Sequence, residues 1–227
     1  MECKIIARAR NGFEYKFGIP RQVREKSKLI TRIVFEPAYR HPEAIRGIEQ
    51  FSHLWLIWGF DEVPNDKRKL TVRPPRLGGN IRQGVFATRS PYRPNPIGLT
   101  SVELLAVEKT DNEGIVLVVR GADMKDGTPI YDIKPYLPYT DCHPNAQGGW
   151  TEQTKDYNLV VQWVEKEQYR SQGCAVDEIV EILEQDPRPA YHNDEREYGI
   201  DYAGWNIRFK VMEQVVMVLQ CQKAKTE

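Results

Sequence analysis

Several signatures are absent from this 227-residue sequence. No run of about 18 apolar residues occurs, which excludes a transmembrane helix. Residues 1–7 mix charged and apolar side chains and lack the apolar core and cleavage site of a secretory signal, so we expect a cytoplasmic protein. The four cysteines, at positions 3, 142, 174 and 221, are widely scattered without a C-x-x-C pair. This spacing predicts reduced thiols and no metal site.

The sequence also lacks the motifs of common catalytic folds. It has no G-x-G-x-x-G, no Walker loop and no G-x-S-x-G elbow, so neither a Rossmann cofactor site, a P-loop nor an α/β-hydrolase site is supported. Excess charge of one sign is missing as well, because 32 Lys and Arg residues balance 32 Asp and Glu residues. Any nucleic-acid site must therefore come from the distribution of charge rather than from its total.

One segment has such a distribution. Residues 67–93 contain no acid but carry eight cations, Lys67, Arg68, Lys69, Arg73, Arg76, Arg82, Arg89 and Arg93. This basic segment predicts a phosphate-binding surface. The alternative is a long loop whose charges are only solvated, and composition alone does not decide between the two.

Hydrophobic patterning predicts a mainly β protein, α+β overall. Strand-like runs separated by Gly, Pro and Asn cover residues 4–9, 30–35, 51–60, 84–88, 97–107 and 115–119, with one short helical stretch at 42–50. Such a series favours a closed or strongly curved sheet. The run 51–60 is apolar on both faces, which is typical of a central strand.

A composition change near residues 140–154 predicts a domain boundary. We expect a β-barrel domain over residues 1–145 and a small α+β domain over 155–227. In the second, the spacing of Val176, Ile179, Val180 and Leu183 predicts a helix over 176–184, and Asp186-Pro187 ends it. The alternating residues 200–222 predict a two-stranded hairpin.

Two rigid polar segments are the candidate ligand sites. Arg89-Ser90-Pro91-Tyr92-Arg93-Pro94-Asn95-Pro96 is stiffened by three prolines, each of which also restricts the residue before it. In Asp132-Ile133-Lys134-Pro135-Tyr136, the acid and the lysine alternate and therefore project to one face of an extended chain. The alternatives are an ordinary rigid turn and a surface salt bridge. His53, inside an apolar strand, is by pattern alone more often structural than catalytic.

The order of several blocks resembles the TrmO/TsaA-type tRNA methyltransferase family along almost the whole chain. The blocks are Pro20-Arg21-Gln22, Phe51-Ser52-His53-Leu54-Trp55, Thr71-Val72-Arg73-Pro74-Pro75-Arg76, Gly84-Val85-Phe86-Ala87-Thr88-Arg89-Ser90, Arg93-Pro94-Asn95-Pro96-Ile97-Gly98, Asp126-Gly127-Thr128-Pro129 and Asp132-Ile133-Lys134-Pro135-Tyr136. Asp186-Pro187-Arg188-Pro189-Ala190-Tyr191 resembles a block in the C-terminal extension of the longer bacterial members.

The resemblance implies a single-sheet β-barrel that binds S-adenosylmethionine, works as a homodimer and methylates the exocyclic N6 of threonylcarbamoyladenosine, just 3′ of the anticodon of tRNA. By position it implies the cofactor residues Pro20, Arg21, Gln22, His53, Leu54, Arg89, Leu99, Asp132, Ile133, Lys134 and Pro135. We further expect Arg73, Arg76, Tyr92, Arg93, Asn95 and Tyr136 to contact tRNA through phosphate contacts and stacking.

The acceptor nitrogen is amide-like, so a proton acceptor would help the methyl transfer. Asp132 is the first candidate catalytic residue and His53 the second. For the C-terminal domain we predict a role in tRNA docking through Arg188, Tyr191 and His192. Two alternatives remain open at this point: a non-catalytic S-adenosylmethionine-binding RNA module, and a methyltransferase or hydrolase acting on a smaller substrate.

Overall fold

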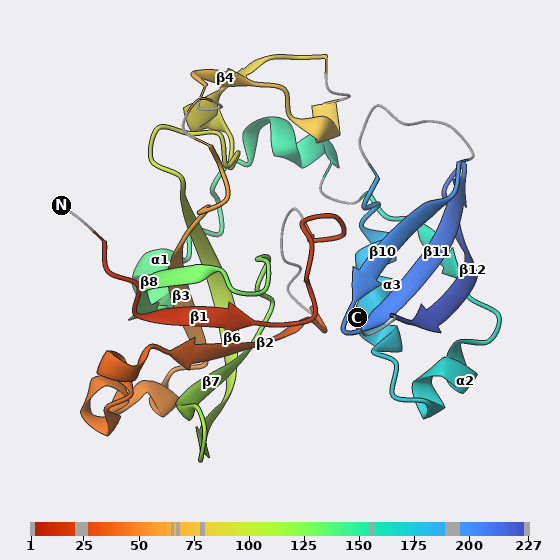
Figure 1. The fold of residues 1–227 in the computed structure, drawn as a ribbon. Coiled ribbons are helices and arrows are strands. Elements are labelled where there is room, and N and C mark those ends of the chain that lie inside the picture. The colour runs from red at the N-terminus through yellow and green to blue at the C-terminus, as the bar shows by residue number, and fades with distance from the viewer. Residues whose placement is uncertain are drawn as a thin grey trace.

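The computed structural model describes residues 3–20, 27–64, 66, 69–77, 80–154, 157–188 and 196–224. Its strands are β1 (Ala7–Arg10), β2 (Ile30–Phe35), β3 (His53–Gly59), β4 (Thr71–Val72), β5 (Gln83–Gly84), β6 (Ile97–Thr110), β7 (Gly114–Arg120), β8 (Pro129–Pro135), β9 (Val160–Gln162), β10 (Tyr198–Tyr202), β11 (Trp205–Met212) and β12 (Val215–Lys223). The α-helices are α1 (Pro138–Asp141), α2 (Lys166–Ser171) and α3 (Val176–Glu184). Two β-rich bodies lie side by side (Figure 1).

The first body is a closed barrel. Its strands follow the order β1-β2-β7-β6-β3-β8, and β8 pairs back with β1. Alternate residues of each strand face inward, so that Leu54 and Leu56 of β3 pack with Ile33, Leu117 and Ile130, all fully buried. Small barrels are filled by side chains in this way. The other residues of β3 face outward and are available for function.

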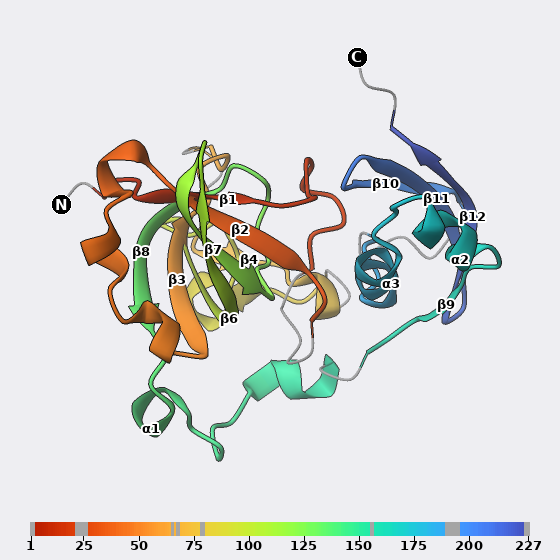
Figure 2. The same cartoon turned by 90° about the horizontal axis from the view of Figure 1, so that it is seen from below.

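The second body is a four-stranded sheet, β10-β11-β12-β9, with α3 packed beside it (Figure 2). The helix has the predicted bounds, and its apolar stripe, which includes Val176, Ile179 and Leu183, is buried in the second core. The expected mainly β protein with a small α+β C-terminal unit is therefore confirmed.

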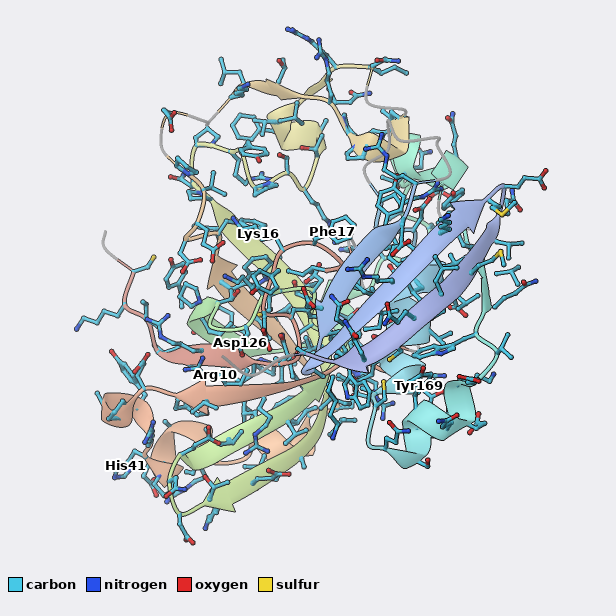
Figure 3. The ribbon with its side chains drawn as sticks, turned by 45° about the vertical axis from the view of Figure 1, so that its right-hand side comes forward. Arg10, Lys16, Phe17, His41, Asp126 and Tyr169 are labelled. Carbon is cyan, nitrogen blue, oxygen red and sulfur yellow. The ribbon has the colours of Figure 1, made fainter. Side chains whose placement is uncertain are left out.

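The connection between β1 and β2 joins two barrel strands and also packs against the second body. Phe13 and Leu29, at its two ends, are 2% and 1% exposed and lie in the core cluster of the second body. The Phe13 ring meets the Tyr202 ring at a centroid distance of 4.8 Å, and the N–H of Ala203 donates to the carbonyl of Gly12. In Figure 3, Lys16 and Phe17 lie on this connection, next to the C-terminal sheet.

Two local predictions were wrong. Residues 85–87 form a 3-10 turn rather than a strand, because the Thr88 hydroxyl donates to the Val85 carbonyl at 2.8 Å and closes the chain locally. The short helical stretch expected at 42–50 is present as two 3-10 turns, Pro42–Ile45 and Ile48–Gln50, and the first turn ends at Arg46, whose ψ is 120°. The expected C-terminal hairpin is a three-stranded meander, because β10 precedes it.

Three further features bear on the sequence-based expectations. None of the helices in the described ranges is long and apolar enough to cross a membrane. Those ranges also contain no group of three or more His, Cys, Asp or Glu side chains able to hold a metal ion. Cys174 and Cys221 are buried with their Sγ atoms 4.0 Å apart, and burial raises the pKa of the Cys174 thiol to about 12, which keeps it protonated and unreactive.

Candidate functional site

The outer face of β3 and its two neighbours gathers several of the predicted site residues. Strand register places them in three rows, Leu99–Ile57–Asp132, Ser101–Trp55–Lys134 and Glu103–His53, and the Tyr136 N–H donates to the His53 carbonyl beside the third row. Because a residue and its cross-strand partner share a face, Leu99, Asp132, Lys134 and His53 all project from this outer face. Residues far apart in sequence thus form one surface.

Asp132 and Lys134 are tied to each other on this face. Lys134 Nζ lies 2.9 Å from Asp132 Oδ2, and the N–H of Ile133 donates to Asp132 Oδ1 at 3.0 Å. Both side chains remain about half exposed, at 47% and 61%. Fixed in this way, opposite charges side by side suit a zwitterionic ligand group.

His53 lies at the opposite end of β3 from Asp132. Asp132 is paired with Ile57, which is four residues from His53, so roughly 13 Å separates the two candidates at about 3.3 Å per residue. Side chains of strands stand roughly perpendicular to the sheet. Asp132 and His53 therefore fit the two ends of an extended ligand better than they fit one reacting atom.

An aromatic cluster surrounds the His53 end. The Tyr136 ring lies 6.2 Å from the His53 ring and 5.5 Å from the Trp55 ring between centroids. The Trp55 indole N–H donates to Asp141 at 2.8 Å, and the Leu137 N–H donates to the same carboxylate at 2.9 Å. These two donors, the backbone one first, hold the pKa of Asp141 below its usual range. Neither Trp55 nor Asp141 was predicted as a site residue, since no local pattern links residues 86 positions apart.

Not every predicted cofactor residue offers its side chain to this face. Leu54 is fully buried, and Ile133 packs against the barrel core, so neither side chain projects from the outer face. Pro20 is buried against the C-terminal body, in a cavity of about 290 Å³ shared with Ile182 and Gln185. Arg21 and Gln22 lie outside the described residues.

A buried polar chain lies at the barrel end that meets the 60–96 segment. The Trp58 indole N–H donates to the Thr100 hydroxyl at 3.0 Å, and that hydroxyl donates to Asp123 at 2.6 Å. Burial raises the pKa of Asp123, and the Thr100 hydroxyl, a backbone hydrogen bond and, last, the Arg89 guanidinium act in the opposite direction. Arg89 itself is exposed. No sequence pattern pointed to Asp123.

In the described ranges, four cations of the basic segment are not paired with an acid. Within the described parts of the chain, Lys69, Arg73, Arg82 and Arg89 are exposed and have no carboxylate within 4.0 Å. By contrast, Arg32 of the barrel wall pairs with two glutamates. The segment forms the upper edge of the molecule around β4 in Figure 1. Lys67, Arg68 and the side chain of Arg76 lie outside the described residues.

The predicted tRNA contacts of the proline-rich loop differ in their accessibility. Tyr92 is 43% exposed and Asn95 is exposed, so both can meet a large ligand. Arg93 is half-buried because its guanidinium donates to the Thr88 carbonyl at 3.1 Å. Its role in this structure is to hold the loop.

Arg188 does not suit the docking role expected for it. Its side chain is only 8% exposed and forms a bidentate pair with Asp186 at 2.8 and 2.9 Å. The Tyr157 hydroxyl donates to the same carboxylate at 3.0 Å. Arg188 thus stabilises the end of α3, and Tyr191 and His192, the other two residues of that prediction, lie outside the described residues.

Comparisons with known proteins agree with this arrangement. The model of the tRNA-methyltransferase O N-terminal domain matches residues 8–142, and that of the TrmO C-terminal domain matches residues 157–224. The tRNA (adenine(37)-N6)-methyltransferase of Escherichia coli K12 is 39% identical over 215 residues, 90% of either chain. A Pseudomonas aeruginosa protein, provisionally named an S-adenosylmethionine-dependent methyltransferase, is 41% identical over 204 residues, 86% of either chain.

The fold has solved counterparts. The crystal structure of TrmO from Pseudomonas aeruginosa superposes with a TM-score of 0.80 at 30% identity, covering 99% of this chain and 97% of that one. A second TrmO crystal structure gives a TM-score of 0.79 at 31% identity. Sequence and structure agree over nearly the full length, and this chain therefore belongs to the tRNA-methyltransferase O family.

Proposed function

We propose that this protein is a cytoplasmic methyltransferase that transfers a methyl group from S-adenosylmethionine to the N6 of adenosine 37 of tRNA, when that adenosine bears a threonylcarbamoyl group. The observation that carries the proposal is the convergence of the family blocks on the outer face of β3, β6 and β8. Residues 1–145 act as the catalytic barrel domain, and residues 155–227 form the smaller C-terminal domain.

The residues of this face fit S-adenosylmethionine. Lys134 is matched to the carboxylate group of its methionine part, and the exposed Leu99, with Ile57 and Trp55 beside it, offers apolar surface for the adenosine part. When bound, S-adenosylmethionine supplies a methyl group on a positively charged sulfur. His53 and Arg89 complete the contacts at its periphery, and Arg21 and Gln22, which the family resemblance also implies, lie outside the described residues.

Asp132 serves as the proton acceptor. The N6 atom of the substrate has a delocalised lone pair, so removal of its proton strengthens it as a nucleophile. Of the two candidates, Asp132 is nearer to the 60–96 segment, because β3 runs from His53 to Gly59 and this segment follows. A base delivered along the basic segment thus reaches Asp132 before His53. The rigid strands align donor and acceptor for in-line transfer.

A homodimer accounts for apolar side chains left exposed on the barrel. Ile97, Leu99 and Leu105 of β6 are 43%, 54% and 37% exposed. Exposed apolar side chains gathered along one strand are typical of an interaction surface. We propose that a second copy covers the Leu99 side of the site.

Phosphate contacts through the basic segment lead to a salt-dependent prediction. In Arg73→Ala, an exposed cation without a carboxylate partner in the described residues is removed. The variant is expected to bind tRNA more weakly and to lower the slope of log affinity against log salt by about 1. Arg32→Ala, which removes a cation already paired with glutamates, is the matched control and should leave the slope unchanged. Filter binding between about 50 and 200 mM salt measures both.

The decisive test of the function is methylation of defined tRNA. The purified protein is incubated with labelled S-adenosylmethionine and total tRNA from cells with and without the threonylcarbamoyl modification, followed by nucleoside mass spectrometry. We expect label on the modified adenosine only. Binding of S-adenosylmethionine without methylation of either pool would favour the non-catalytic module. In a parallel incubation with free nucleotides, transfer to a small nucleotide alone would favour the small-substrate enzyme.

A further inference from the structure

A buried carboxylate of the C-terminal domain holds the connection between β1 and β2. Glu181 of α3 accepts the Ser27 hydroxyl at 2.7 Å and the Lys28 backbone N–H at 2.5 Å, one on each carboxylate oxygen. The Ser27 hydroxyl oxygen in turn accepts the Leu29 N–H at 3.2 Å. Glu181 is 6% exposed and Ser27 is 3% exposed. Charge-assisted bonds in such a site are strong and fix the chain closely.

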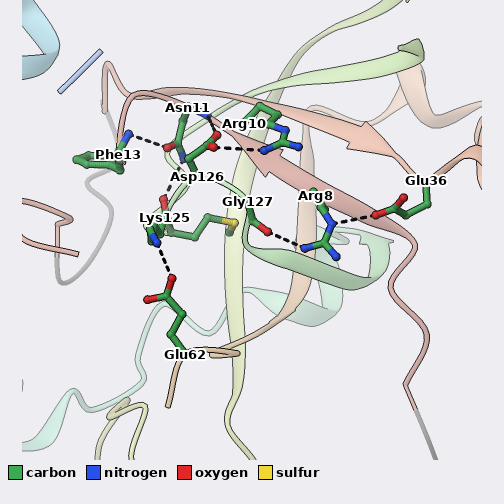
Figure 4. Close-up of polar contacts among 10 residues, drawn as sticks. Arg8, Arg10, Asn11, Phe13, Glu36, Glu62, Lys125, Asp126 and Gly127 are labelled. Atoms are coloured by element: carbon green, nitrogen blue, oxygen red, sulfur yellow. Dashed lines mark hydrogen bonds and ion pairs between the residues drawn. The ribbon is translucent and has the colours of Figure 1, made fainter. Parts of the chain in front are cut away.

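The same connection is held from the barrel side. The Asn11 backbone N–H donates to Asp126 at 3.0 Å, and its amide donates to the Met124 carbonyl at 2.9 Å (Figure 4). Arg10 adds an ion pair to Asp126 at 3.3 Å. The first end of the connection is therefore held by the barrel as well as by the C-terminal sheet. The second end is held by α3 through Glu181 and by the barrel, where the Leu29 carbonyl accepts the Gly121 N–H at 2.9 Å.

Residues held by Glu181 are also part of the site. Ser27, Lys28 and Ile30 line a cavity of about 940 Å³ between the two bodies. Its barrel wall includes His53, together with Glu103 and Arg120. On the opposite side it is bounded by Asp177 and Glu178 of α3. A shift of residues 27–30 would change the space next to His53, to which the proposed function gives a cofactor contact.

We propose that Glu181 is a positioning residue for S-adenosylmethionine, through which the C-terminal domain sets residues 27–30 and the cavity at His53. The inference rests on the proposed function, because that function makes the His53 face the cofactor site. It gives the C-terminal domain a role in the reaction that does not require contact with tRNA. Glu181 touches neither reacting group in this scheme.

The test separates cofactor affinity from turnover and from stability. In Glu181→Gln, the negative charge is removed and one carboxylate oxygen becomes an amide NH₂ that cannot accept the Ser27 hydroxyl, so the charge-assisted bond donated by Ser27 is lost. We expect the Kd and KM for S-adenosylmethionine to rise roughly tenfold, the effect of losing one bond to a charged group, with kcat at saturating cofactor within about twofold. Ser27→Ala should shift the same constants in the same direction, and the double variant should be less than additive.

Glu197→Gln is the matched control. Glu197 lies in the same domain but pairs with Arg208 on the surface at 3.1 Å, and its loss should leave the cofactor constants unchanged. Calorimetric titration gives the Kd without any need for turnover, so a wild-type protein that fails to methylate tRNA would overturn the function but not the positioning role. A fall in Tm of Glu181→Gln and Ser27→Ala with an unchanged Kd would show a purely structural clamp and would overturn the inference.

Discussion

Replacing Asp132 by asparagine is expected to lower kcat for the modified tRNA by about two to four orders of magnitude, the range typical for loss of a general base. Asparagine keeps the size of the side chain and the oxygen that accepts the Ile133 N–H at 3.0 Å, but it cannot take a proton. Single-turnover methylation at saturating S-adenosylmethionine measures the loss directly.

His53→Ala is the matched comparison for this prediction. His53 is roughly 13 Å along the sheet from Asp132, too far for both to serve one nitrogen. We expect this variant to raise the KM for S-adenosylmethionine and to change kcat much less. The reverse pattern, a large loss of kcat in His53→Ala and a small one in Asp132→Asn, would assign the proton to His53.

Local sequence patterns predicted the elements whose own residues determine them. The helix α3 has the predicted bounds, since its apolar stripe at 176, 179, 180 and 183 and the following Asp186-Pro187 are local signals. The strand β2 also has its predicted bounds, because Thr31, Ile33 and Phe35 alternate with outward residues. The turn at 85–87 was not predicted, because its apolar residues favoured a strand. The Thr88 hydroxyl instead donates to the Val85 carbonyl, three residues earlier.

The site itself depends on how neighbouring strands are aligned, and the pattern within one strand does not specify that alignment. Position-by-position resemblance supplied Leu99, His53 and Asp132, but only the pairing of β3 with β6 and β8 shows that they share one face. Asp123 and Asp141 had no local signal, because their partners Thr100 and Trp55 are distant in the sequence. The same holds for Glu181, whose hydrogen-bond partners are more than 150 residues away.

Gly98 shows how a position within a family block acts through packing rather than contact with a ligand. It is the cross-strand partner of Trp58, and a Cβ at this position would lie 2.2 Å from the indole ring. The ring has little freedom to move, since it packs against Phe60 at 4.3 Å between centroids and its N–H donates to Thr100.

Gly98→Ala is therefore expected to destabilise the protein by about 1–3 kcal/mol, the usual cost of overpacking a core. For a chain of this size that corresponds to a fall in Tm of roughly 2–12 °C, which scanning calorimetry measures. Gly84→Ala is the control, because a Cβ there meets nothing within 4 Å and its φ of −60° suits alanine. A Tm for Gly98→Ala equal to that of Gly84→Ala would mean that the Trp58 ring can move aside to accept the added methyl group.

Leu99 follows Gly98 directly in β6, so a destabilised Gly98→Ala should also weaken S-adenosylmethionine binding, and Gly84→Ala should not.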